Sequence, residues 1–160
     1  MKKLLAILLS VLMLCTMIPF ATVSAADGIT IELEVSEEYV NAGDEFEVTV
    51  WLTGNPGLIG AQVQILYDTD AIELVGEWDG EDFYPEISFN KKWRAQYTSF
   101  GPYGTCIGSF VNGTASSAIT EEEFYTALFV AKEDAYTGDY DLSVNYKPGN
   151  FFTLGMEIVA

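Results

Sequence analysis

The sequence predicts an all-β fold, a β-sandwich or jelly roll, that follows a short leader. Apolar and polar residues alternate at a period of two in several short segments, which is typical of strands with one buried face. Turn signals built on Gly, Pro, Asn and Asp recur about every 8–12 residues, and no segment has a convincing helical period. The chain is 49% apolar and 14% aromatic, which is too rich for a disordered protein.

The first 25 residues have the pattern of a cleaved secretory signal peptide. Lys2 and Lys3 precede an apolar run from Leu4 to Phe20, and Val23-Ser24-Ala25 resembles a cleavage site. The run is near the lower length limit for a membrane span, and no basic stop-transfer cluster follows it. We therefore predict a signal peptide over residues 1–25 and one exported domain over residues 26–160, with no membrane association after cleavage.

Most of the exported domain divides into expected strands. Asp- and Gly-containing turns separate the first four, and residues 124–132 are predicted as a strand rather than a helix because Phe, Tyr, Thr and Val are frequent there. Residues 76–103 contain many aromatic residues without a clear period, so we expect a loop with one or two short strands. Cys106 is expected to be a small core residue on a strand. The expected strands cover residues 29–35, 46–52, 61–67, 72–75, 105–111, 124–132, 140–146 and 152–159.

Composition excludes several function classes. The chain has 24 acidic and 7 basic residues, a net charge of −17 and no histidine. Phosphate backbones would repel such a chain, so we expect no nucleic-acid partner, and catalysis by a histidine-containing triad is excluded. Acidic turns at residues 68–70 and 79–82 lack the spacing of a calcium-binding loop and are read as solvated turns, so no metal is expected. No carboxylate pair stands out as a glycosidase pair, and we predict that the protein is not an enzyme.

An ordered series of segments resembles the cohesin family. Asn41 to Val50 is similar to the second strand of cohesins, with its Gly-Asp start. Asn55 to Asp68 is similar to the stretch in which a proline-glycine turn leads into a strand that ends in Tyr-Asp. The resemblance spans residues 29–160, and its remaining segments are residues 71–76, 118–120, 124–132 and 137–140.

The resemblance implies a nine-stranded jelly-roll sandwich that binds dockerin domains and performs no reaction. Dockerins belong to polysaccharide-degrading enzymes such as glycoside hydrolases, which cohesins gather into cellulosomes. The calcium of such a complex belongs to the dockerin, so no cofactor is expected on this chain. We expect a secreted, extracellular monomer, and no surface anchor is visible in the sequence.

The resemblance also implies which residues contact the partner. Gly60 and Gln62 fall where many cohesins have Asn and Asp, which indicates a different partner specificity. For Ile107, packing in the core is an equally good reading. Acidic neighbours of this face would favour a partner with Lys or Arg. The stretch from residue 147 to 151 is shorter than in the family, and no contact is assigned there. The expected partner-binding residues are Gly60, Gln62, Gln64, Thr105, Ile107, Ser109, Asn112 and Gly113.

A carbohydrate-binding module is the alternative function, since such modules share sandwich folds. Its expected binding residues are Trp78, Trp93, Tyr97 and Tyr103, whose rings would stack on sugars; the competing reading is that most of these rings fill the core. The basic residues Lys91, Lys92 and Arg94 either contact an acidic partner or protect an edge strand from aggregation.

Overall fold

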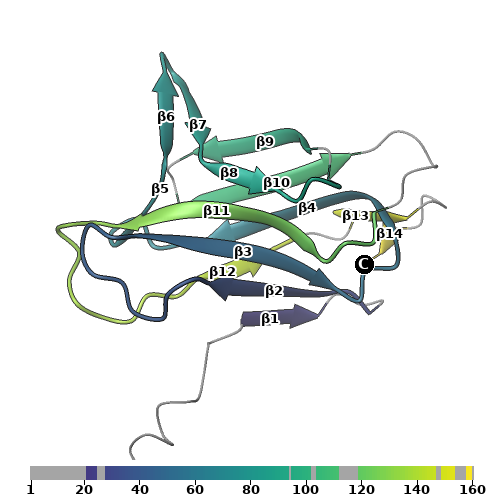
Figure 1. Ribbon diagram of the computed structural model, residues 1–160, viewed down its shortest axis with the longest axis horizontal. Coiled ribbons are helices and arrows are strands. Elements are labelled where there is room, and N and C mark those ends of the chain that lie inside the picture. Colours follow the sequence, from purple (N-terminus) through teal and green to yellow (C-terminus); the bar gives the residue numbers. More distant parts are fainter. Residues whose placement is uncertain are drawn as a thin grey trace, which may run out of the picture.

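The computed structural model describes residues 21–24, 28–93, 95–101, 104–111, 119–146, 149–153 and 158–159. Two antiparallel sheets pack against each other, and a separate hairpin stands away from them at the upper left of Figure 1. Every described element is a strand. The predicted all-β sandwich is therefore confirmed.

The first sheet has the strand order β1-β2-β3-β11-β5, and β8 pairs with β11 beside β5. β5 and β8 pair with successive stretches of β11 along one edge, so together they occupy one strand position. The bounds are β1 (Ala21–Ser24), β2 (Thr30–Val35), β3 (Glu45–Thr53), β5 (Ile72–Leu74), β8 (Ile87–Phe89) and β11 (Glu123–Ala131).

The second sheet has the strand order β14-β13-β4-β10-β9, and β12 pairs with β4 beside β13. β12 and β13 again share one edge of their neighbour. The bounds are β4 (Leu58–Leu66), β9 (Ala95–Gly101), β10 (Thr105–Val111), β12 (Ser143–Asn145), β13 (Phe151–Thr153) and β14 (Ile158–Val159).

The prediction of nine strands agrees with the structure when strands are counted by the positions they occupy in the two sheets. If each shared edge counts once and β1 is left out, the described strands of the two sheets fill nine positions. β1 lies in the segment predicted to be the signal peptide and pairs with the edge of β2. Cleavage after Ala25 would remove β1 and leave β2 as the edge strand.

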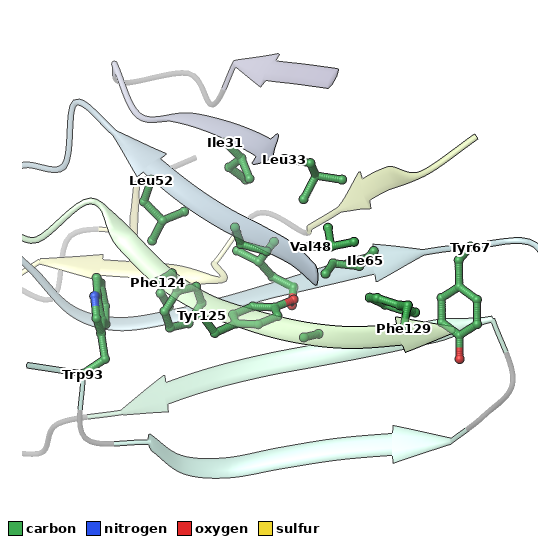
Figure 2. Close-up of a cluster of buried hydrophobic side chains, with 14 of the residues drawn as sticks. Ile31, Leu33, Val48, Leu52, Ile65, Tyr67, Trp93, Phe124, Tyr125 and Phe129 are labelled. Carbon is green, nitrogen blue, oxygen red and sulfur yellow. The ribbon is translucent and has the colours of Figure 1, made fainter. Parts of the chain in front are cut away.

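The core lies between the two sheets (Figure 2). It is built by the inward rows that the alternating sequence predicts, such as Val48 on β3 and Ile65 on β4, both fully buried. The buried Tyr125 of the first sheet donates a hydrogen bond from its hydroxyl to the Val63 carbonyl of the second sheet, at 3.1 Å. This bond fixes β11 against β4, the central strand of the second sheet.

Three segments differ from their predictions. Residues 76–103 hold four strands, β6 (Gly76–Asp79), β7 (Asp82–Pro85), β8 and β9, in place of a loop with one or two. The expected strand over residues 140–146 shortens to β12, and the expected final strand becomes β13 and β14. The segment 124–132 is a strand, as predicted, and Cys106 lies on β10, although its side chain is outside the described residues.

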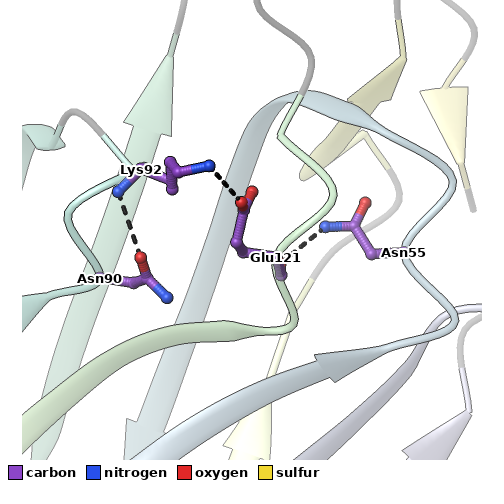
Figure 3. A network of polar contacts seen from close by, with 4 residues as sticks. All are labelled: Asn55, Asn90, Lys92 and Glu121. Carbon is purple, nitrogen blue, oxygen red and sulfur yellow. Dashed lines mark hydrogen bonds and ion pairs between the residues drawn. The ribbon is translucent and has the colours of Figure 1, made fainter.

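A polar network ties three segments together at one end of the sandwich (Figure 3). The Lys92 Nζ atom lies 2.8 Å from Glu121 Oε1, and Asn55 Nδ2 donates to the Glu121 carbonyl at 3.0 Å. The hydrogen bond from Lys92 holds the pKa of the Glu121 carboxyl below its ordinary value, and the same bond raises the pKa of the Lys92 ammonium group. Lys92 therefore joins the turn before β9 to the segment before β11.

Candidate binding face

The outward row of β4 runs through the centre of the second sheet. Its members alternate with the buried residues Ala61, Val63 and Ile65. Gln62 pairs with Ser109 of β10, and Gln64 pairs with Ile107 of β10 on one side and with Asn145 of β12 on the other. Directly opposed residues of an antiparallel pair share a sheet face. These neighbouring rows form one surface, which we call the amide face: Gly60, Gln62, Gln64, Thr105, Ile107, Ser109, Asn145 and Asn150.

Two side-chain amide pairs cross the amide face. Asn145 Nδ2 donates to Gln64 Oε1 at 2.7 Å, and Asn150 Nδ2 donates to Gln62 Oε1 at 2.8 Å. The Gln62 backbone N–H also donates to the Asn150 carbonyl, at 3.0 Å. All four side chains are half-buried, and the bonds restrict their rotamers. The two glutamine Nε2 groups take no part in these two bonds, so their N–H donors are not used within the amide pairs.

The described amide face carries no charged residue. The adjacent β9 row, placed by its register with β10, adds only Tyr97, Ser99 and Gly101. A protein of net charge −17 must therefore carry its acidic residues elsewhere. The face itself consists of amide, hydroxyl and aliphatic residues, so any acidic neighbours of the kind expected must lie around it and not within it.

The opposite side of the sandwich is acidic. The outward rows of the first sheet, which alternate with its buried rows, carry six glutamates on β2, β3, β5 and β11. The exposed Glu34 accepts a hydrogen bond from the Trp51 Nε1–H group at 2.8 Å. The two outer faces therefore differ in charge, and only the acidic one would attract cations strongly. The six residues are Glu32, Glu34, Glu45, Glu47, Glu73 and Glu123.

The structure brings six of the eight predicted partner-binding residues onto one face. Ile107 occupies the same register row as Gln64, while Cys106 occupies the row of the buried Ile65. The register gives the row of Ile107, while its side chain lies outside the described residues. Gly60 and Ser109 are buried, the latter only 8% exposed, so larger neighbours must provide most of the contact surface. Asn112 and Gly113 lie outside the described residues.

Sequence reasoning missed Asn145 and Asn150. Asn150 lies in the short stretch of residues 147–151, where no family contact was assigned, and Asn145 lies on the strand expected over residues 140–146, where no contact residue was named. β12 and β13 each pair with β4 on either side of that stretch, which brings both asparagines to the glutamines. The available signal was the period-two spacing of Ser143 and Asn145 in the outward row.

The four aromatic residues of the carbohydrate alternative do not form one platform. Trp93 is 2% exposed, and its ring centroid lies 4.7 Å from that of Phe124 in the core. A sugar cannot stack on Trp93 there. Trp78 is 56% exposed on the separate hairpin. Tyr97 lies opposite Ser109, with its side chain outside the described residues, as is all of Tyr103.

The described residues offer little else as a site. Within them, no three His, Cys, Asp or Glu side chains group as metal ligands. None of the described elements is a helix that could cross a membrane.

The described strands define a two-layer β-sandwich module with one uncharged outer face. The model of the cohesin domain family matches residues 29–158. The chain therefore belongs to the cohesin domain family, as the sequence resemblance predicted.

Solved cohesin structures share the fold at low sequence identity. The sixth cohesin of Acetivibrio cellulolyticus scaffoldin B, in complex with a mutant Cel5 dockerin, is 19% identical with a TM-score of 0.61, over 81% of this chain and 90% of that one. The Clostridium thermocellum OlpA cohesin in complex with Doc918 is 16% identical with a TM-score of 0.61, over 81% and 91%. The cohesin CaCohA2 of Clostridium acetobutylicum is 15% identical with a TM-score of 0.59, over 79% and 81%. A search of curated proteins gave no match.

Proposed function

We propose that this protein is a secreted, non-catalytic cohesin module that binds the dockerin of a polysaccharide-degrading enzyme through the amide face. The observation that carries the proposal is an uncharged sheet face, crossed by two amide pairs, on a chain of net charge −17. Structurally similar cohesins have been solved with a Cel5 dockerin and with Doc918, which supports the same class of partner here.

The physical properties of the face suit a helical partner. β4 and β10 pair over seven residues each, which makes the centre of the face a rigid ladder. Because the described face carries no charge, burying it against a partner avoids the large cost of desolvating ions, and the amide pairs offer hydrogen bonds that set the register of the partner. Since the side chains are already held by one another, less conformational entropy is lost on binding.

The test is capture of purified dockerin modules by the protein, with calcium and with a chelator. We expect capture only with calcium, because the dockerin holds that ion. The variant Gln62→Ala/Gln64→Ala should weaken capture at least about tenfold, since two hydrogen-bonding side chains are lost from the face. The matched control Glu45→Ala/Glu47→Ala truncates two long side chains on the opposite sheet and should bind normally.

Two capture results would contradict the proposal. If no dockerin of a broad panel is captured with calcium, the proposal is wrong. If both double variants bind equally well, the amide face is not the contact surface. A parallel gel-retardation assay with soluble glucans and xylans tests the carbohydrate alternative, which predicts slower migration of the unmodified protein.

Secretion forms a separate part of the proposal. We propose cleavage after Ala25 and an extracellular location, supported by the basic start, the apolar run and the small residues before the site. N-terminal sequencing of the protein from the culture medium should begin at Ala26. Recovery of an uncleaved chain would contradict this.

A further inference from the structure

The β6–β7 hairpin has two chemically different faces. Its register pairs Gly76 with Pro85, Glu77 with Tyr84, Trp78 with Phe83 and Asp79 with Asp82. Because side chains alternate along each strand, Trp78, Phe83 and Pro85 lie on an apolar face. The other face carries three carboxylates and the Tyr84 ring. We call the second one the Tyr84 face, and its members are Glu77, Asp79, Asp82 and Tyr84.

The apolar face fixes the hairpin. The rings of Trp78 and Phe83 lie 5.1 Å apart by their centroids, and Phe83 packs against the core. A Cβ atom on Gly76 would lie 2.6 Å from the tip of the Phe83 ring and 2.5 Å from the Tyr84 carbonyl, so only glycine fits there. The hairpin therefore has a defined shape although it projects from the sandwich (Figure 1).

The Tyr84 face is exposed, and nothing described neutralises its charge. Tyr84 is 58% exposed. Asp79 lies directly opposite Asp82, an arrangement of like charges that destabilises a strand pair. The sequence has no Lys or Arg between residues 76 and 90, and the ion pair formed by the described residues joins Lys92 to Glu121 elsewhere. The hairpin therefore accepts an electrostatic cost that a cationic partner would relieve.

The position of the hairpin relates it to the amide face. The hairpin connects β5 to β8, which share one edge of the first sheet, and Val75 and Glu86 at its base bond to Leu128 of β11. β7 also lies close to β9, the edge strand of the sheet that carries the amide face. The hairpin therefore projects on the side where these two sheet edges lie (Figure 1), and it carries three carboxylates whereas the amide face carries none.

We propose that the Tyr84 face binds a Lys- or Arg-bearing segment of the protein held on the amide face. A cationic side chain fits over the Tyr84 ring, which attracts it through the ring face, while Glu77 and Asp82 supply ion pairs. The identity of that protein rests on the proposed function. The recognition of a basic segment by the hairpin does not, because it depends only on the described residues of the hairpin.

The experiment is a ¹⁵N NMR titration of the protein, produced from the full sequence in a secreting host. The probe is a synthetic twelve-residue peptide that alternates Lys or Arg with Gly and Ser, and its matched copy replaces each basic residue by Gln. We expect saturable shifts of the Glu77 and Tyr84 amides with the basic peptide alone. The shifts should weaken as salt is added.

Two charge variants locate the effect. Glu77→Gln/Asp79→Asn/Asp82→Asn should weaken peptide binding by about fivefold or more. The control Glu45→Gln/Glu47→Gln/Glu73→Gln removes the same number of charges from the outer face of the first sheet. It should change the affinity for the peptide less than about twofold. Tyr84→Leu keeps the charges and should weaken binding about two- to threefold, with the cross-strand amide pattern of the hairpin retained as the check on folding.

The outcomes separate this inference from the dockerin proposal. Equal weakening by both triple variants would show only general attraction to an acidic protein and would overturn the hairpin site. Absence of peptide shifts, or shifts caused by a soluble glucan in place of the peptide, would also overturn it. If the peptide binds as expected but no dockerin is captured, the hairpin site stands and the proposed function fails.

Discussion

The Gln64–Asn145 amide pair offers a quantitative test of how the amide face is held in place. Gln64 lies on the long strand β4, whereas Asn145 ends β12, which has three residues and pairs with β4. The variants Gln64→Ala and Asn145→Ala each remove one partner of the 2.7 Å hydrogen bond. The double variant removes both partners and leaves no unpaired amide.

The expected size of the effect follows from partial burial. A neutral hydrogen bond contributes about 0.5–1.5 kcal/mol to stability, and water can replace it partly because both side chains are half-buried. We expect each single variant to lower the free energy of unfolding by about 1 kcal/mol. The double variant should lose only slightly more than either single variant, which gives a coupling energy of about 1 kcal/mol.

The assay is urea unfolding of the four proteins, with the slope m compared to confirm two-state behaviour. Hydrogen exchange should show faster opening of β12 in each single variant, since its pairing with β4 is short. Fully additive losses, with a coupling below about 0.3 kcal/mol, would refute the reasoning. They would mean that the pair does not form in solution and that the face is not organised before binding.

Three further predictions test other contacts. Tyr125→Phe removes the hydroxyl that bonds to a carbonyl of β4 and should lower the free energy of unfolding by about 1–2 kcal/mol in the same urea assay. Gly76→Ala forces a Cβ into the facing strand, so near-ultraviolet circular dichroism should show altered aromatic packing in the hairpin while the sandwich stays folded. Lys92→Met should lower the urea midpoint slightly at pH 7 but not near pH 3. The bond to Lys92 lowers the pKa of Glu121, so the stability that this bond contributes is lost as the pH falls through that lowered pKa. If the urea midpoints of the unmodified protein and Lys92→Met still differ near pH 3, the ion-pair explanation is contradicted.

Alternation predicted most of the strands because each sheet buries one face. On β3, Phe46, Val48, Val50 and Leu52 are buried, and the residues between them are not. The same rule identified the outward row with Gln62 and Gln64. The β6–β7 hairpin escaped this reasoning because its apolar face lies largely outside the core, so both of its faces carry aromatic residues and no clean period appears.

The amide pairs and the place of Trp93 could not be predicted from local pattern. Asn145 and Asn150 reach the glutamines across 81 and 88 residues of chain, and such contacts depend on which strands become neighbours. An aromatic ring suits either a core or a sugar-binding surface. Contact with Phe124, far along the sequence, decides that Trp93 belongs to the core.

The central claim is that the amide face, and not the acidic face, receives the dockerin. An NMR titration of the protein with a purified, calcium-loaded dockerin module tests it most directly, because side-chain amides and indoles give resolved signals on both faces. We expect the side-chain amide signals of Gln62, Gln64 and Asn145 to shift and the indole signal of Trp51 to stay in place. A shifted Trp51 indole with unchanged glutamine signals would place the partner on the first sheet and contradict the claim.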